Sequence, residues 1–307
     1  MQLKGFHHLT AVTADAPKNH QFYTQVLGLR MVKKTVNQDD TSSYHLFYAD
    51  GKGNPGTDIT FFDWPTGPER RGTNSIIRTG LRIKGENAFT WWADHFKKNN
   101  VRFKDPINRL GRLTMDFEDF EGQRLSLVND ESDTPFYVWE KSSVPAEHQV
   151  RGLGPITLSV PDITATDAVL TNVMGMTLLK NDDGLHVYKM NAEGPVSELH
   201  VRVESLLQPA RQGAGSVHHV AFNIAMKDHT AWANHLKEFR VPNSGPVDRF
   251  WFKSLYFREP NGILFEIATD APGFAADESM ETLGETLSLP PFLEARRAQI
   301  EAGLKKL

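Results

Sequence analysis

The sequence predicts an α+β protein made of four copies of one β-α-β-β-β module, followed by a C-terminal tail. Three observations support this prediction. A strand-like phrase near the start, Phe6–Val12, returns late in the chain as Val217–Asn223. Two weaker copies of the phrase begin at Ile77 and Pro155. Each copy precedes a helical pattern and then strand-like segments within about fifty residues, the size of such a module.

The first module spans residues 1–66. After its opening strand, Asp15 can cap a helix and Pro17 suits the first helical turn. Apolar residues then recur at helical spacing until Gly28 ends the segment. An apolar strand is expected over residues 58–63, before a linker rich in proline and glycine.

Three further modules follow in the same order, over residues 74–132, 150–206 and 214–270. Their helices are expected to carry Trp91 and Trp92, Val169 to Met174, and Trp232 to Phe239, respectively. After them the chain becomes acidic and then helical. We interpret residues 271–307 as a tail that wraps the body and not as a fifth module.

Composition narrows the class of protein. The chain has 34 Lys and Arg against 38 Asp and Glu, a net charge of −4 without long charged runs, so neither nucleic acid nor an anionic membrane is an expected partner. It has no cysteine, which excludes disulfides, zinc–thiolate sites and iron–sulfur clusters. With no apolar run of about 20 residues and no signal-peptide core at the start, we expect a soluble cytoplasmic protein.

Alignment of the four modules singles out candidate metal ligands. The opening strands carry, at one aligned position, His8, Leu81, Ile156 and His219. The closing strands carry, at another aligned position, Phe62, Ser126, Glu198 and Glu266. Only modules one and four have a histidine, and module four adds a carboxylate. Two imidazoles and one carboxylate suit Fe(II) or Mn(II) with positions left open for substrate and oxygen.

Strand geometry predicts different positions for the two histidines of each neighbouring pair. His7 and His8 are expected to face opposite sides of the sheet, as are His218 and His219, so one of each pair can enter the barrel. Glu266 stands in an apolar strand, where a carboxylate is costly to bury unless it is paired or bound to a metal.

A shared metal site has a topological consequence. If the ligands of modules one and four meet on one metal, these two modules share a barrel, and modules two and three form the other. A site shared between swapped subunits is the competing arrangement, and a homo-oligomer is left open.

The two His-His strands and the phrase Asn261–Ile267 resemble the vicinal oxygen chelate superfamily of glyoxalases, bleomycin-resistance proteins and extradiol dioxygenases. Within it, the chain is similar to the hydroquinone-type ring-cleaving dioxygenases. The resemblance implies two open mixed β-barrels and an Fe(II) ion held by His8, His219 and Glu266, with Mn(II) or another divalent metal also open. It implies a small hydroquinone or catechol and O2 as the substrates, and a role in aromatic degradation or quinone detoxification.

The same resemblance implies roles for four more residues, Thr10, His218, Arg249 and Tyr256. Tyr256 is expected to hydrogen-bond a substrate hydroxyl, and Arg249 to supply fixed positive charge. Thr10 lies two positions from His8 and is expected to orient a water or the substrate. The ordinary alternatives are a surface ion pair for Arg249 and a core position for Tyr256.

Two related enzyme types fit the sequence less well. Glyoxalase I uses four ligands, and Phe62 stands where the fourth is expected. Some catechol dioxygenases take their ligands from modules three and four, but Ile156 cannot serve. A metal-dependent isomerase, lyase or thiol transferase and a non-catalytic binding protein for aromatic compounds remain alternatives. The other histidines, His45 among them, are interpreted as background, and Glu198 as a charge at a sheet edge.

Overall fold

The computed structural model describes all 307 residues and arranges sixteen strands in two mixed sheets. The first sheet has the order β14 (Val247–Asp248), β15 (Lys253–Arg258), β16 (Leu264–Thr269), β13 (Val217–Ile224), β1 (Phe6–Thr13), β4 (Asp58–Asp63), β3 (Tyr44–Ala49), β2 (Arg30–Val36). The second has the order β10 (Thr177–Asp182), β11 (Leu185–Lys189), β12 (Glu198–Val203), β9 (Leu153–Val160), β5 (Ser75–Ile83), β8 (Arg124–Asn129), β7 (Arg112–Glu118), β6 (Ile107–Arg109). The predicted α+β class with two open half-barrels is confirmed.

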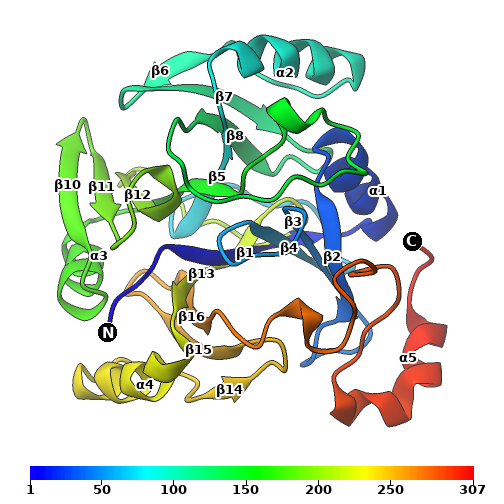
Figure 1. Cartoon of the computed structure of the whole chain (residues 1–307). Helices are drawn as coiled ribbons and strands as arrows, with labels where there is room; N and C mark the ends of the chain where they lie inside the picture. The colour runs from blue at the N-terminus through cyan, green and yellow to red at the C-terminus, as the bar shows by residue number, and fades with distance from the viewer.

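The first sheet joins the two ends of the chain. Its strands β1 to β4 come from the start, and β13 to β16 come from the region after residue 214. The two halves meet where β1 pairs antiparallel with β13. Figure 1 shows β1, in dark blue, crossing the middle of the molecule near β13 and β4. The strands that carry His8, His219 and Glu266 are therefore neighbours.

Helices occupy short stretches between the strands. They are α1 (Ala16–Gln21), α2 (Asn87–Lys98), α3 (Thr164–Ala168), α4 (His229–Glu238) and α5 (Arg297–Gly303). Single π-helical turns extend α1 over Phe22–Val26 and α3 over Val169–Val173. Short 3-10 turns lie at Ala146–His148, Pro195–Ser197, Met226–Asp228, Phe274–Ala276 and Pro291–Arg296. None of the helices combines the length and apolarity that crossing a bilayer requires.

The helix ends reveal an internal duplication. The stretches that begin with α1 and α3 both end at a glycine with positive φ, Gly28 at 68° and Gly175 at 67°. The helices α2 and α4 instead precede a non-glycine residue in the left-handed region, Asn100 and Arg240, both with φ of 55°. Modules one and three thus share one helix ending, and modules two and four share another.

The tail packs along the outer part of the first sheet. Leu287 forms a bridge to Lys34 of β2, and Leu289, Leu293 and Ile300 are buried with Val36. Figure 1 shows this segment, in orange and red, running beside β2 to the C-terminus. Apolar burial therefore holds the tail against the sheet that carries the candidate site.

Candidate metal centre

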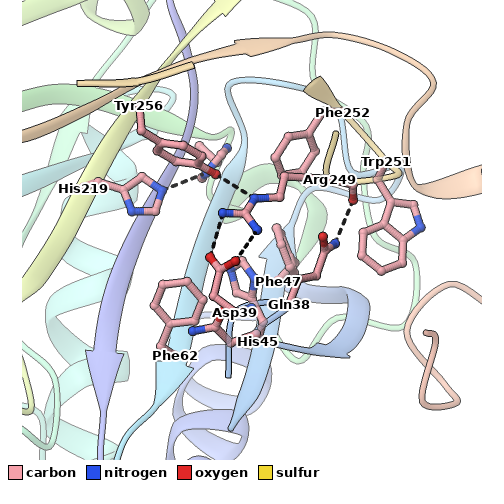
Figure 2. Close-up of a pocket in the computed structure, with 12 residues that line it drawn as sticks. Gln38, Asp39, His45, Phe47, Phe62, His219, Arg249, Trp251, Phe252 and Tyr256 are labelled. Carbon is pink, nitrogen blue, oxygen red and sulfur yellow. Dashed lines mark hydrogen bonds and ion pairs between the residues drawn. The ribbon is translucent and has the colours of Figure 1, made fainter. Parts of the chain in front are cut away.

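A pocket lies among the strands of the first sheet, and its space, together with the mouth that is open to solvent, is about 400 Å³. Its wall combines aromatic rings with polar side chains (Figure 2). The lining residues are His8, Asn37, Gln38, Asp39, His45, Phe47, Phe62, His219, Arg249, Trp251, Phe252 and Tyr256. Such a wall offers apolar contact to a flat ring and a few hydrogen-bonding groups to orient it.

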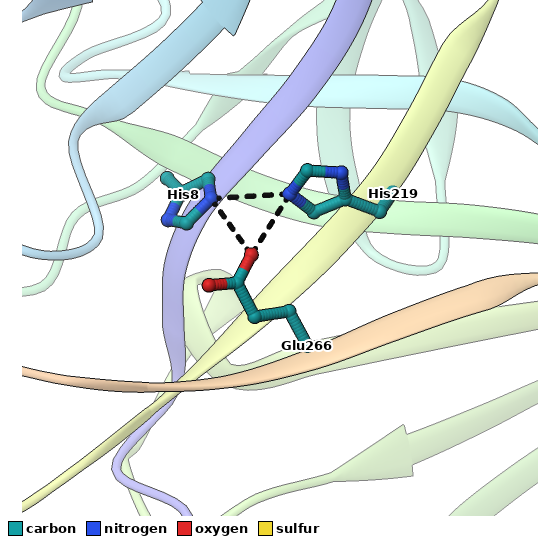
Figure 3. A group of neighbouring side chains, drawn as sticks. All are labelled: His8, His219 and Glu266. Atoms are coloured by element: carbon teal, nitrogen blue, oxygen red, sulfur yellow. Dashed lines mark hydrogen bonds and ion pairs between the residues drawn. The ribbon is translucent and has the colours of Figure 1, made fainter. Parts of the chain in front are cut away.

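Three potential ligand atoms converge beside this cavity (Figure 3). Glu266 Oε2 lies 3.2 Å from His8 Nε2 and 2.9 Å from His219 Nε2. The two imidazole nitrogens are 3.3 Å apart. All three residues are buried. The structure thus brings together the three residues predicted as metal ligands.

Two β-bulges place the neighbouring histidines differently from the expected alternation. Between β1 and β13 the register shifts at His7 and again at His218, so each is an extra residue opposite a regular strand. A bulge interrupts the alternation of side chains. The prediction that the paired histidines face opposite sides is therefore wrong: His7 Nδ1 lies 2.9 Å from His8 Nδ1, and His218 Nδ1 lies 2.7 Å from His219 Nδ1.

These contacts determine where His8 carries its hydrogen. His7 Nε2 lies 3.0 Å from the carbonyl oxygen of Thr269, which can only accept, so His7 Nε2 is the donor. In the neutral His7 ring, Nδ1 then accepts from His8 Nδ1. His8 Nε2 is left with its lone pair directed toward Glu266, as a metal ligand requires.

His218 Nδ1 faces His219 Nδ1 as His7 Nδ1 faces His8 Nδ1, but no carbonyl oxygen near its Nε2 fixes its tautomer. Burial and the neighbouring His219 lower the pKa of His218 to about 3, and burial and His8 lower that of His7 to about 3. Both rings are therefore neutral at physiological pH and can accept a hydrogen bond from the neighbouring Nδ1. With the hydrogen of His219 on Nδ1, its Nε2 lone pair faces Glu266 Oε2 and the Thr10 hydroxyl, and a bound cation would replace that hydroxyl as its partner.

Glu266 supplies the negative charge of the site. Burial raises the pKa of Glu266, whereas protonated imidazoles at His8 and His219 would lower it well below the usual value, as a cation bound between them would. Its Oε1 accepts a hydrogen bond from Ser254 at 2.5 Å, whereas Oε2 has no hydrogen-bond donor and no exposure to solvent. A buried carboxylate oxygen left unpaired between two imidazole nitrogens needs a cation.

The donor set fits a divalent metal ion. With metal–ligand bonds of about 2.1 Å, neighbouring positions of an octahedron are about 3.0 Å apart. The three observed separations, 2.9, 3.2 and 3.3 Å, are close to that value. Two imidazoles and one carboxylate on one face leave the opposite positions open, the arrangement typical of non-haem Fe(II) oxygenases.

Arg249 and Tyr256 lie on the cavity wall. Arg249 forms a two-bond ion pair with Asp39 at 3.1 and 2.8 Å, and its Nε donates to Tyr256 Oη at 3.3 Å. Burial and the charge of Glu266 raise the pKa of Tyr256, which keeps its phenol protonated. Since Arg249 donates to it, the Tyr256 hydroxyl hydrogen is free to point into the cavity.

A chain of hydroxyl groups connects Thr10 to His45, a histidine that was not predicted to belong to the site. Thr10 Oγ1 lies 3.0 Å from His219 Nε2 and accepts a hydrogen bond from Thr60 Oγ1 at 2.8 Å. Thr60 in turn contacts His45 Nε2 at 2.9 Å. Asp39, His45 and Thr60 are site residues that the sequence did not predict. Only His45 left a signal, because it shares one face of its strand with Phe47.

The strand register corrects the proposed alignment of Phe62 with Glu266. Glu266 lies opposite Ala221, two residues after His219, and the corresponding position after His8 is Thr10, opposite Thr60. Thr60, not Phe62, is the counterpart of Glu266. A shift by two residues keeps every side chain on the same face, so the apolar pattern of the strand could not reveal the error.

The second sheet has no comparable set of ligands. Glu198, interpreted as an edge charge, is buried and forms a two-bond ion pair with Arg112 at 2.7 and 2.6 Å. It also lies 3.3 Å from His200, and Arg78 faces Asp116 at 3.2 Å nearby. The interpretation of Glu198 is therefore wrong, because guanidinium groups hold the carboxylates of this barrel.

Comparison with known proteins identifies the superfamily to which this architecture belongs. The sequence model of the Glyoxalase/Bleomycin resistance protein/Dioxygenase superfamily matches residues 5–127 and 152–267. The chain belongs to this superfamily.

Full-length relatives lie within the superfamily. "Putative ring-cleaving dioxygenase MhqA" of Bacillus subtilis is 46% identical over the whole of both chains. "Chlorohydroquinone/hydroquinone 1,2-dioxygenase" of Sphingobium indicum is 29% identical, with 97% of this chain and 95% of that protein covered. The crystal structure of a "putative dioxygenase" from B. subtilis matches with a TM-score of 0.92 and 34% identity, over 100% of this chain and 98% of that one.

More distant members share only the fold. Glyoxalase I from Zea mays has a TM-score of 0.64 and 16% identity, with 87% of this chain and 92% of that chain covered. The scaffold alone therefore does not distinguish among the chemistries of the superfamily.

Proposed function

We propose that this protein is an Fe(II)-dependent dioxygenase that opens the ring of a hydroquinone- or catechol-type compound with O2. The observation that carries the proposal is a buried set of two histidines and one glutamate next to a cavity with aromatic walls. The relatives named as ring-cleaving and hydroquinone dioxygenases support it, since the similarity to them extends over nearly the whole chain.

His8, His219 and Glu266 are the residues that would hold the metal. When bound, Fe(II) would lower the pKa of a substrate hydroxyl and bring the aromatic ring and dioxygen together. Both oxygen atoms of O2 would enter the opened product, so the reaction needs no external reductant.

The chain's own side chains orient the substrate and stabilise charge. Phe47, Phe62 and Phe252 offer apolar surface to the ring and exclude water from it. Tyr256 donates a hydrogen bond to an oxygen of the substrate, and Arg249 provides a permanent positive charge for an anionic phenolate.

Oxygen uptake provides the direct test. Protein reconstituted with Fe(II) without oxygen is mixed with aerated hydroquinone, methylhydroquinone or catechol in an oxygen-electrode cell. We expect one O2 consumed for each ring opened, with loss of the aromatic absorbance. A metal-loaded protein that consumes no oxygen with any of these compounds contradicts the proposal.

The alternatives predict different outcomes. A glyoxalase-like isomerase or lyase would work under nitrogen with Ni(II), Mn(II) or Zn(II), but the position of a fourth carboxylate is taken here by Thr60. A binding protein would bind one aromatic molecule without turnover. The same reconstituted protein, assayed under air and under nitrogen, separates these functions.

A further inference from the structure

The ring of His45 is held in a defined orientation on the cavity wall. It projects from β3 and packs against Phe47 and Phe62, with ring centroids 4.0 and 4.4 Å away. Its Nε2 lies 2.9 Å from Thr60 Oγ1. Aromatic packing and the hydrogen bond to Thr60 therefore hold the ring without any contribution from a ligand.

The hydroxyl chain determines which nitrogen of His45 carries the hydrogen. Thr60 Oγ1 donates its single proton to Thr10 Oγ1 at 2.8 Å, so it can only accept from His45 Nε2. His45 Nε2 is therefore the N–H donor and Nδ1 holds the lone pair. Burial, with the nearby His8 and His219, also lowers the pKa of His45 well below 6.5, which keeps the ring neutral.

Nδ1 of His45 is a free acceptor in a cavity whose other polar groups are occupied or donate. Gln38 donates to the carbonyl oxygen of Arg249 at 2.9 Å, and the Asp39 carboxylate is neutralised by the Arg249 guanidinium. Arg249 has no acceptor, and the hydroxyl hydrogen of Tyr256 is free to point into the cavity. His45 Nδ1 has no hydrogen-bond partner within the chain.

We propose that His45 is a substrate-binding residue whose Nδ1 accepts a hydrogen bond from the ring hydroxyl that does not bind at the metal centre. The inference rests on the proposed function, because it takes an aromatic diol as the ligand. It implies that a residue of β3 recognises the second hydroxyl group of the substrate. An aromatic compound with the same ring and an ether in place of that hydroxyl would leave the acceptor unpaired, which costs affinity.

Binding of two matched probes tests the inference without turnover. Hydroquinone and 4-methoxyphenol share one phenol, but only hydroquinone has a second hydroxyl to donate. We expect the Fe(II)-loaded protein, titrated calorimetrically in oxygen-free buffer, to bind hydroquinone about tenfold more tightly. Equal dissociation constants for the two probes, or no binding of either, would overturn the inference.

Two substitutions separate the nitrogens of the ring. His45→Gln retains a polar group near the Nε2 position for Thr60 but has none near Nδ1. This variant should therefore bind hydroquinone and 4-methoxyphenol with about equal dissociation constants. His45→Asn retains an oxygen near Nδ1 and should preserve the preference. His186→Gln, on β11 of the other sheet, is the control and should bind both probes like the wild type. A His45→Gln protein with the wild-type preference contradicts the inference.

The oxygen assay distinguishes this inference from the proposed function. Uptake of O2 with hydroquinone, together with no probe preference, refutes the role of His45 and leaves the dioxygenase intact. A preference that depends on His45, without any uptake, supports the hydroxyl acceptor and refutes the dioxygenase. If His45→Gln fails to fold by circular dichroism, the comparison of probes on the wild type still decides.

Discussion

At the scale of single residues, the candidate metal centre depends on which nitrogen of each histidine is protonated. His8 and His219 both direct Nδ1 to a neighbouring histidine and Nε2 to Glu266. The two contacts leave three acceptors facing one another at 3.3 Å or less. A hydrogen on one imidazole would pair only that ring with Glu266, whereas a metal ion would pair with all three acceptors at once, which favours metal binding.

Removal of the charge on Glu266 should abolish metal binding. In Glu266→Gln an amide replaces the anionic ligand. We therefore expect Fe(II) affinity to fall by more than about 100-fold, a larger loss than is typical when a residue that only hydrogen-bonds to a ligand is replaced. Elemental analysis after equilibrium dialysis measures the bound iron. Glu198→Gln, in the other sheet, is the matched control and should retain the iron. A Glu266→Gln protein with wild-type iron content would contradict the assignment.

Substitution of His7 tests the tautomer argument. His7→Phe removes the acceptor for His8 Nδ1 while it retains an aromatic ring, and we expect Fe(II) affinity to drop about 10- to 100-fold. Competition with a chromophoric chelator gives the dissociation constant. His7→Asn retains an acceptor near the Nδ1 position and should lose less. Equal affinities for His7→Phe and the wild type would show that the contact does not orient His8.

At the scale of elements, a repeated turn closes the β7–β8 and β15–β16 hairpins. Asp119 Oδ1 accepts hydrogen bonds from the backbone N–H groups of Glu121 and Gln123, both at 2.9 Å. Glu259 accepts from Asn261 and Ile263 at 2.8 and 3.1 Å in the corresponding turn, 140 residues later. In each turn a carboxylate satisfies backbone donors that the strands leave unpaired.

The turn at Asp119 predicts a pH dependence of stability. Burial outweighs the hydrogen bonds and raises the pKa of Asp119 from 3.8 to about 6. Because the folded-state pKa is the higher one, its contribution to stability is full below about pH 4 and is lost as pH rises through about 6. The loss is on the order of 3 kcal/mol.

Asp119→Asn should remove this dependence. Urea unfolding at pH 4.5 and pH 7.5 measures the free energy of unfolding, and the difference between variant and wild type cancels the other titrating groups. We expect the free energy of unfolding of Asp119→Asn, relative to that of the wild type, to be higher at pH 7.5 than at pH 4.5. A difference that is independent of pH would contradict the raised pKa.

At the scale of the whole molecule, the tail connects the outer strand β2 to the cavity wall. Lys33 of β2 has no exposed surface and pairs with Asp277 at 2.8 Å and with Glu278. Asp277 also accepts a hydrogen bond from Trp251 Nε1 at 2.8 Å. Since Trp251 lines the cavity, the tail braces the wall of the candidate site.

Removal of Asp277 should weaken both the fold and the pocket. Asp277→Ala leaves Lys33 with Glu278 and frees Trp251, so we expect a loss of about 2 kcal/mol in unfolding free energy and weaker hydroquinone binding. Urea unfolding and calorimetry measure the two effects. Glu294→Ala removes only an exposed ion pair with Arg297 and should leave both the unfolding free energy and hydroquinone binding close to those of the wild type. Similar effects of both substitutions would contradict a bracing role.

Much of this architecture is readable from the amino-acid order. The repeated His-His strands and the acidic residue in an apolar strand identify His8, His219 and Glu266, because burial of such groups is costly unless they bind something. The helical and strand periods likewise predict the α+β class. These signals are local or repeat along the chain, so one sequence is enough to detect them.

Other features depend on how distant segments meet. The bulges at His7 and His218, the pairing of Thr60 with Thr10, and the closure of the wall by Asp277 and Trp251 arise only when strands from both ends of the chain take their register. A strand pattern with a period of two is unchanged by a two-residue shift, and it does not reveal which strand lies next to which. The candidate ligands can therefore be predicted from the sequence, whereas the tertiary structure decides their orientation and forms the cavity around them.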